Sequence, residues 1–230
     1  MNGPLFEVNG VSKVYRLGEV EVTALKDVSL EVQAGEYVAV MGPSGSGKST
    51  FLHLLGLLDR PTTGRVLIAG QDTGRLGERE LARLRNRRLG FVFQAFNLLP
   101  RTSVLENVTL PLEYAGLPAW ERASRGRALL ARVGLGDRER HQPNQLSGGQ
   151  QQRVAIARAL ASDPAAILAD EPTGNLDSHS AAEILSVFDE LHREGRTIVL
   201  ITHDPKVAAR VQRQIVFHDG SVLSDELRAA

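Results

Sequence analysis

The sequence contains no cysteine and few aromatic residues, which make up 5% of its 230 residues. The absence of cysteine excludes disulfides, thiolate metal ligands and thiol nucleophiles. An excess of basic charge is also missing, because 27 Lys and Arg residues balance 27 Asp and Glu residues. Dedicated nucleic-acid-binding proteins usually carry a basic stripe, so we expect no nucleic-acid partner.

Long hydrophobic runs are missing as well. The richest stretch, residues 51–58, is much shorter than the ~20 residues that a membrane-spanning helix needs. The first five residues show neither the basic nor the apolar region of a secretory signal. We therefore expect a soluble, cytoplasmic chain that reaches a membrane only through a partner. The length and the 42% of hydrophobic residues suit one globular α/β domain with an insertion.

Hydrophobic patterning predicts an α/β fold whose first third is mainly β. The buried runs 37–41, 165–169 and 197–201 predict parallel strands, and Asp219-Gly220 predicts a hairpin turn near the end. The spacing is helical over 49–58 and, mostly, over 96–146. We expect a single domain: a core with an antiparallel β subdomain (1–94 and 152–230) and a helical insertion (95–151).

Residues 42–49, GPSGSGKS, match the phosphate-binding P-loop pattern. Glycines let backbone N–H groups turn toward phosphate oxygens, and the following helix points its positive end at the same group. We assign Lys48 to the β- and γ-phosphates of ATP and the Ser49 hydroxyl to Mg²⁺. The alternative is a glycine-rich turn, but this segment follows a buried strand and opens a helix, as a P-loop does. The predicted ATP-binding residues here are Gly42, Pro43, Ser44, Gly45, Ser46, Gly47, Lys48, Ser49 and Thr50.

Two adjacent carboxylates, Asp170 and Glu171, end the apolar run 167–169. A carboxylate at a strand end beside a P-loop can bind Mg²⁺. Because neighbouring residues on a strand point to opposite sides, unless the strand has already ended, we assign Asp170 to the metal and Glu171 to the attacking water as general base. Taken alone, such a pair also fits the solvated start of a loop.

Residues 146–150, LSGGQ, predict a second helix N-terminus able to bind an anion. Ser147 and Gln150 have the spacing of a capping box, and Gly148 and Gly149 leave the backbone open. One nucleotide does not need two such helix ends from one chain. We therefore expect this end to contact the nucleotide held by a second copy; the alternative is an ordinary glycine-containing cap.

Three single residues are further candidates. Gln94 follows the strand run 90–93 and can bind Mg²⁺ or the attacking water, and His203 follows the run 197–201 and can contact the γ-phosphate. Tyr15 can stack on adenine. Each of the three, taken alone, also fits a structural role.

Together these motifs resemble those of the ATP-binding cassette family, the nucleotide-binding subunits of ABC transporters. Walker A (42–49), the glutamine loop at Gln94, the signature (146–150) and Walker B (ending at 170–171) occur in the family's order. The resemblance also implies a D-loop containing Asp177, a switch histidine at His203 and an adenine-stacking aromatic at Tyr15. It implies a P-loop NTPase of the ABC ATPase type, with Mg²⁺ as cofactor, that forms a head-to-tail homodimer around two ATP molecules.

Segments 55–62, 91–100 and 105–108 are most similar to the lipoprotein-release and macrolide-export branch. That resemblance implies a separately encoded permease that docks near Gln94 to Pro100 and holds the protein at the inner face of the cell membrane. The apolar residues Phe96, Leu98 and Leu99 favour a partner surface there, or else fill the core of the helical insertion.

Three other functions are alternatives for a chain with these motifs. A cell-division or signalling ABC complex would use ATP without moving cargo. A soluble ABC ATPase of DNA maintenance would carry coiled coils, a cysteine-rich zinc insert or a basic surface, and none is present in the sequence. A P-loop kinase is disfavoured because it leaves residues 147–150 without a role.

Overall fold

The computed structural model describes residues 3–18 and 20–227, which belong to two compact units. The first unit is formed by Met1–Ala82 with Gly195–Ala230, and the second by Arg83–Glu194. The predicted helical insertion, 95–151, falls entirely within the second unit, while its predicted boundaries with the core stay a prediction.

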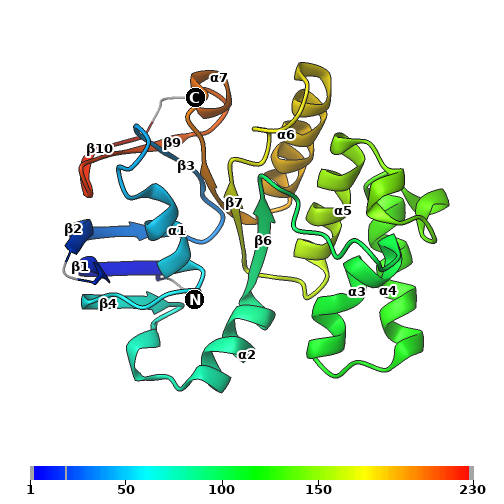
Figure 1. Cartoon of the computed structure of the whole chain (residues 1–230), viewed down its shortest axis with the longest axis horizontal. Coiled ribbons are helices and arrows are strands. Elements are labelled where there is room, and N and C mark those ends of the chain that lie inside the picture. Colours follow the sequence, from blue (N-terminus) through cyan, green and yellow to red (C-terminus); the bar gives the residue numbers. More distant parts are fainter. Residues whose placement is uncertain (1–2, 19, 228–230) are drawn as a thin grey trace. The chain divides into compact units, whose positions relative to one another are not determined.

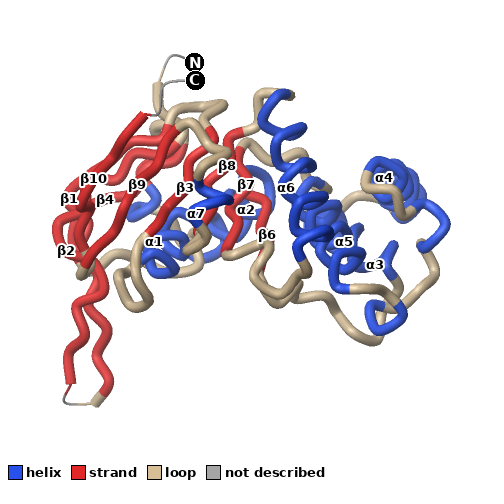
Figure 2. The backbone as a smooth tube through the Cα atoms, turned by 90° about the horizontal axis from the view of Figure 1, so that it is seen from above, coloured by secondary structure: helices blue, strands red, loops and turns tan. Residues whose placement is uncertain are grey.

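An antiparallel sheet, in the order β2-β1-β4-β5, makes up one part of the first unit. Its strands are β1 (Phe6–Leu17), β2 (Val20–Val32), β4 (Thr63–Ile68) and β5 (Gln71–Asp72). Val28, Leu30 and Val32 are buried while their neighbours are exposed, which confirms the alternation expected of a half-buried strand. Because β1 pairs with β4 only as far as Ser12, the rest of β1 pairs with β2 alone and forms a long ribbon (Figure 2).

A set of parallel and antiparallel strands makes up the other part of the first unit. Its strands, in the order β10-β9-β3-β8, are β10 (Ser221–Leu227), β9 (Arg213–His218), β3 (Tyr37–Met41) and β8 (Thr197–Ile201). Strand β3 pairs in parallel with β8, as the apolar runs predicted, and also with β9, which was not predicted. The last two strands form the expected hairpin, in which Asp219 (φ 47°) and Gly220 (φ 83°) supply the two left-handed residues that a tight turn requires.

The first unit has helices at two of its strand ends. Helix α1 (Lys48–Leu55) follows β3 and packs against β2 and β8, and the short α7 (Pro205–Ala208) follows β8. A 3₁₀ turn, Thr73–Arg75, precedes α2 (Glu78–Arg88), whose residues belong partly to each unit. No helix was predicted over α2, because this arginine-rich helix buries only Leu81 and so lacks a clear apolar stripe.

The second unit contains one parallel strand pair and a group of helices (Figure 1). The pair is β6 (Leu89–Phe93) with β7 (Ala166–Asp170). The helices are α3 (Val104–Tyr114), α4 (Ala119–Arg132), α5 (Gly148–Leu160) and α6 (Ser178–Arg193), with 3₁₀ turns at Gly136–Arg138 and Pro143–Gln145. Helices α3, α4 and α5 pack together around a cluster that includes Val108, Leu130 and Val154, which confirms the predicted helical character of this region.

Gly90 shows how closely α5 packs on β6. A Cβ added at Gly90 would lie 2.5 Å from the carbonyl oxygen of Ala159, a backbone atom that cannot move aside without shifting the helix. We predict that Gly90→Ala lowers the free energy of unfolding by about 1–3 kcal/mol, the usual cost of overpacking. Denaturant unfolding measures this, with Gly77→Ala as control, since the nearest atom there is a flexible Glu80 oxygen at 3.5 Å. Equal stability of the two variants would contradict the close packing.

Candidate nucleotide-binding site

The loop between β3 and α1 has a backbone that only glycine adopts without strain. Gly42 (φ 141°), Gly45 (φ 79°) and Gly47 (φ 100°) all have positive φ. A Cβ added at Gly42 would collide with the Phe217 carbonyl oxygen, and one added at Gly47 would collide with the Ala24 carbonyl oxygen. The loop therefore forms a tight cradle lined by backbone, as phosphate binding by N–H groups requires.

The N-terminus of α1 is open toward this cradle. Its N-cap, Gly47, has no side chain to bind the first N–H groups, and Phe51 N donates to Gly47 O at 2.8 Å as the helix begins. N–H groups in a first helical turn lack intrahelical acceptors and carry the positive end of the helix dipole. The Ser46 hydroxyl is buried and has no hydrogen-bond partner among the described residues. These groups fit a bound anion.

Lys48 lies across the same loop. Its Nζ donates to the carbonyl oxygen of Pro43 at 2.7 Å, and the residue is 8% exposed. The ammonium group is thus held inside the glycine-rich loop, where it can exchange its hydrogen bond to a carbonyl oxygen for hydrogen bonds to phosphate oxygens. Ser49 next to it is exposed, and Thr50 is partly buried.

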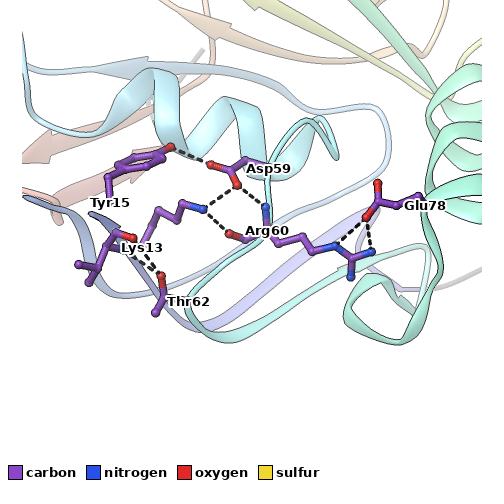
Figure 3. Close-up of polar contacts among 7 residues, drawn as sticks. Lys13, Tyr15, Asp59, Arg60, Thr62 and Glu78 are labelled. Atoms are coloured by element: carbon purple, nitrogen blue, oxygen red, sulfur yellow. Dashed lines mark hydrogen bonds and ion pairs between the residues drawn. The ribbon is translucent and has the colours of Figure 1, made fainter. Parts of the chain in front are cut away.

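Tyr15 and His203 also belong to the first unit. Tyr15, on β1, is half-buried, and its hydroxyl donates to Asp59 Oδ2 at 2.9 Å (Figure 3). His203 is exposed and follows the end of β8, as predicted; the next residue, Asp204, caps α7. The roles assigned to Tyr15 and His203 stay predictions.

Asp170 is the last residue of β7, and Glu171 has already left the strand. Glu171 has a left-handed backbone (φ 45°), and its carbonyl oxygen accepts from Gly174 N at 3.0 Å in a turn. The opposite directions expected for neighbouring strand residues therefore do not constrain this pair. A non-glycine residue in this region of φ costs of order 1 kcal/mol or more, and such strain concentrates at functional sites.

Gln94, directly after β6, is hydrogen-bonded to the segment that follows Glu171. Its Nε2 donates to Asn175 Oδ1 at 3.2 Å, and Asn175 Nδ2 donates back to the Gln94 carbonyl oxygen at 3.1 Å. A Cβ on Gly174 would lie 2.6 Å from Gln94 Nε2, so glycine is needed for this contact. The structure thus brings Gln94 next to residues 174–175, a pairing that the sequence did not suggest.

The predicted capping box at the start of α5 is confirmed. Gln150 N donates to Ser147 Oγ at 3.3 Å, and Ser147 N donates to Gln150 Oε1 at 3.0 Å. Gly149 is buried, and a Cβ there would lie 2.9 Å from Ser180 Oγ on α6. This glycine therefore has a packing role besides any contact with a nucleotide.

Asp177 caps the neighbouring helix α6. Its carboxylate accepts from the N–H groups of His179 and Ser180, each at 3.0 Å, and from Ser180 Oγ at 2.7 Å. The hydrogen bonds from Ser180, followed by that from the His179 N–H, lower the pKa of Asp177. The D-loop residue inferred by resemblance thus has a definite structural role within the chain.

Three polar side chains that sequence analysis missed hold the loop after β6. Gln152 is fully buried and donates from Nε2 to the carbonyl oxygens of Pro172 (2.6 Å) and Phe93 (3.3 Å). Arg158 donates to the carbonyl oxygens of residues 96 and 97, and burial lowers its pKa. Asn107, also fully buried, binds both the N–H and the carbonyl oxygen of residue 99. The sequence signal that could have identified these three residues is a polar side chain on an otherwise apolar helix face.

The apolar residues of the loop after β6 were expected either to form a partner surface or to fill the core of the helical insertion, and the structure shows some of each. Leu98 packs against the helical cluster around Val108, so it fills the core of this unit. Phe96 is half-buried, and Leu99 is 44% exposed. Only Leu99 is left as a clearly exposed apolar side chain.

In residues 3–18 and 20–227, no helix combines the length and the apolar character needed to cross a membrane. The same part of the chain contains no group of three or more His, Asp or Glu side chains placed to hold a metal ion.

The chain matches the family model for ABC transporters over residues 25–174. It is 58% identical to an uncharacterised ABC transporter ATP-binding protein of Thermotoga maritima, over 97% of this chain and 96% of that protein. It is 55% identical to a macrolide export ATP-binding/permease protein of Hyphomonas neptunium, over 98% of this chain but only 35% of that protein.

A solved structure is also similar over nearly the whole chain. It is a dimeric post-hydrolysis state of the ATP-binding cassette MJ0796 bound to ADP and Pi, with 45% identity and a TM-score of 0.90. The match covers 98% of this chain and 99% of that one.

The position of Lys48 makes the cradle testable. Lys48→Ala removes the charge that would face the phosphates, so we predict an ATP affinity at least about 30-fold weaker, since losing one partner of a buried charge pair costs about 2–5 kcal/mol. Calorimetric titration of the folded variant measures this, with the exposed Lys26→Ala as control. An unchanged affinity in Lys48→Ala would refute the assignment of this loop.

Proposed function

This chain belongs to the ABC transporter family, in which it is an ATP-binding cassette with ATPase activity, and we propose that two copies close around two ATP molecules to drive a membrane permease. The observation that carries the proposal is the presence of two helix N-termini suited to phosphate in one chain. One follows the glycine cradle at α1, and the other is the capped start of α5. A composite site uses both: one copy holds the nucleotide at α1, and its partner adds Ser147–Gln150.

In the proposed site, the loop from Gly42 to Ser49 binds the phosphates through its backbone N–H groups. Lys48 exchanges the carbonyl oxygen of Pro43 for the β- and γ-phosphate oxygens. Because Ser46 Oγ is buried without a described partner, it supplies a further donor toward the same anion. Tyr15 stacks on the adenine.

The donor chemistry of Ser49, Gln94 and Asp170 fits Mg²⁺. These residues offer a hydroxyl, an amide and a carboxylate oxygen, and Mg²⁺ is usually held by one or two carboxylates together with substrate phosphates and water. When bound, the ion neutralises charge on the β- and γ-phosphate oxygens.

The proposed chemistry is attack of water on the γ-phosphorus of ATP. Glu171 accepts a proton from the water as its oxygen bonds to phosphorus, and the bond to the β,γ-bridging oxygen breaks to release ADP and phosphate. Glu171 directly follows Asp170 at the end of β7, so the proposed proton acceptor and the proposed metal ligand lie at the same strand end. His203 contacts the γ-phosphate and orients it.

We propose an export permease as the membrane partner. The chain spans 35% of the length of the macrolide-export relative, whose name joins an ATP-binding and a permease part. The loop from Gln94 to Pro100, with exposed Leu99, is the proposed docking segment, and it places the chain at the inner face of the membrane. Rigid support of this loop by Arg158 and Asn107 suits a segment that transmits force.

Glu171→Gln separates ATP binding from hydrolysis. The substitution keeps the size of the side chain but removes the proton acceptor, so we predict a hydrolysis rate about 10²–10⁴-fold lower. The closed dimer then persists, and the variant elutes as a dimer with ATP and as a monomer with ADP. Size-exclusion chromatography with light scattering, run beside an ATPase assay, measures both effects.

The exposed Glu190, on α6 of the same unit, provides the control variant Glu190→Gln, for which we expect wild-type behaviour. Near-normal hydrolysis by Glu171→Gln would remove Glu171 from the catalytic role. An inactive variant that stays monomeric with ATP would contradict the composite site.

Ser147→Arg tests the contribution of the second copy. The bulky cation blocks the N-terminus of α5, so we predict that the monomer still binds ATP but no longer dimerises with it. Ser103→Arg is a matched control, because Ser103 forms the same kind of capping box with Glu106 at the start of α3. Its substitution therefore costs the same ~1 kcal/mol of capping energy as that of Ser147. If Ser147→Arg also abolished ATP binding by the monomer, or if both variants dimerised equally, this part of the proposal would fail.

A further inference from the structure

We propose that Asp59 and Lys13 are positioning residues that hold the Tyr15 ring in the orientation in which it stacks on the nucleotide base. Adenine then binds without having to order the ring first. This inference rests on the proposed function, in which Tyr15 stacks on adenine. It assigns a task to Asp59 and Lys13, which had no predicted role at the nucleotide site. The group links β1 to the segment that follows α1, and both belong to the first unit (Figure 3).

One carboxylate connects the three side chains. Asp59 Oδ2 accepts from the Tyr15 hydroxyl at 2.9 Å, and Asp59 Oδ1 accepts from Lys13 Nζ at 2.6 Å. Lys13 Nζ also donates to the Arg60 carbonyl oxygen at 2.8 Å. The Tyr15 ring is therefore fixed through its hydroxyl by Asp59, and Asp59 is itself held by the charged Lys13.

The backbone around Tyr15 is held by the same segment. Thr62 N donates to the Ser12 carbonyl oxygen at 2.9 Å, and Val14 N donates to Thr62 Oγ1 at 3.0 Å. Val14 already lies beyond Ser12, where the pairing of β1 with β4 ends. The segment 59–62 thus replaces a strand neighbour for the part of β1 that carries Tyr15.

Charge and protonation favour a lasting contact. Burial opposes ionisation of Asp59, but the hydrogen bonds from Lys13, the Arg60 N–H and Tyr15 outweigh it, so the pKa of Asp59 is lowered. Burial raises the pKa of Tyr15, as does the hydrogen bond to Asp59, while the Thr50 side chain lowers it; the net direction is upward. At neutral pH the carboxylate therefore accepts and the phenol donates.

Lys13 also restricts how a base can approach. Its Nζ lies 4.8 Å from the centre of the Tyr15 ring, within the range of a cation–π contact. The cation thus covers one face of the ring, and only the other face is open to adenine. The ring is held beside α1, because Asp59 follows this helix and Thr50 lies in its first turn, next to the phosphate cradle.

The test compares ATP with inorganic tripolyphosphate, each with Mg²⁺, by titration calorimetry of the full chain. When the ring is released, part of the binding free energy of ATP is used to order it, which corresponds to an affinity loss of about three- to tenfold. We expect this loss for ATP in Asp59→Ala and in Tyr15→Phe, which keeps the ring but lacks the hydroxyl. Tripolyphosphate affinity should not change in either variant. The double variant should be no weaker than the single ones, since both remove the same contact.

Glu78→Gln is the matched control, because it removes the ion pair that Arg60 makes on the other side of the same segment and leaves Tyr15 untouched. It should bind both ligands normally. An unchanged ATP affinity in Tyr15→Phe and Asp59→Ala would overturn the proposal, and so would an equal loss for both ligands, which would indicate general damage to the cradle. Tyr15→Phe decides the question if Asp59→Ala does not fold. A wild-type chain that binds neither ligand would instead contradict the proposed function.

Discussion

Backbone N–H groups can surround a phosphate only where the chain approaches its neighbours more closely than a Cβ allows, and the first unit is arranged around this constraint. Gly42 and Gly47 each lie against a backbone carbonyl oxygen of another strand. The hairpin turn supports the loop from behind, since Gly220 N donates to the Ser46 carbonyl oxygen at 3.1 Å and Lys26 N donates to the Gly220 carbonyl oxygen at 2.8 Å. The terminal hairpin is therefore part of the phosphate cradle, although it lies far from it in the sequence.

The second unit solves a different problem, which is to hold an irregular loop in one conformation. Phe96 (φ 61°) and Asn97 (φ 50°) both have left-handed backbones, which is costly for a bulky residue such as Phe96. Arg158 offsets this cost by donating to the carbonyl oxygens of both residues. Buried polar side chains thus position the loop that carries Gln94 and the proposed docking surface.

Local signals in the sequence were sufficient for the features that depend on neighbouring residues. The buried runs became β3, β7 and β8, and the S-x-x-Q spacing became the capping box of α5, because strand burial and capping are set within a few residues. The same kind of signal failed for α2, whose single buried residue, Leu81, leaves no periodic pattern. It also could not separate Leu98, which is in the core, from Leu99, which is exposed.

The sequence by itself therefore determined the family, the P-loop, the order of the motifs and the positions of the buried strands, because each is encoded in a short run of residues. The tertiary structure alone decided which distant residues support the site residues: Asp59 bonds to the Tyr15 hydroxyl, Gln152 to the carbonyl oxygens of Phe93 and Pro172, and Asn175 to Gln94. Such contacts join residues that are 20 to 81 positions apart. Their partners are chosen by the path of the folded backbone and by the need of each buried polar group for a hydrogen bond, and neither is visible in a local pattern.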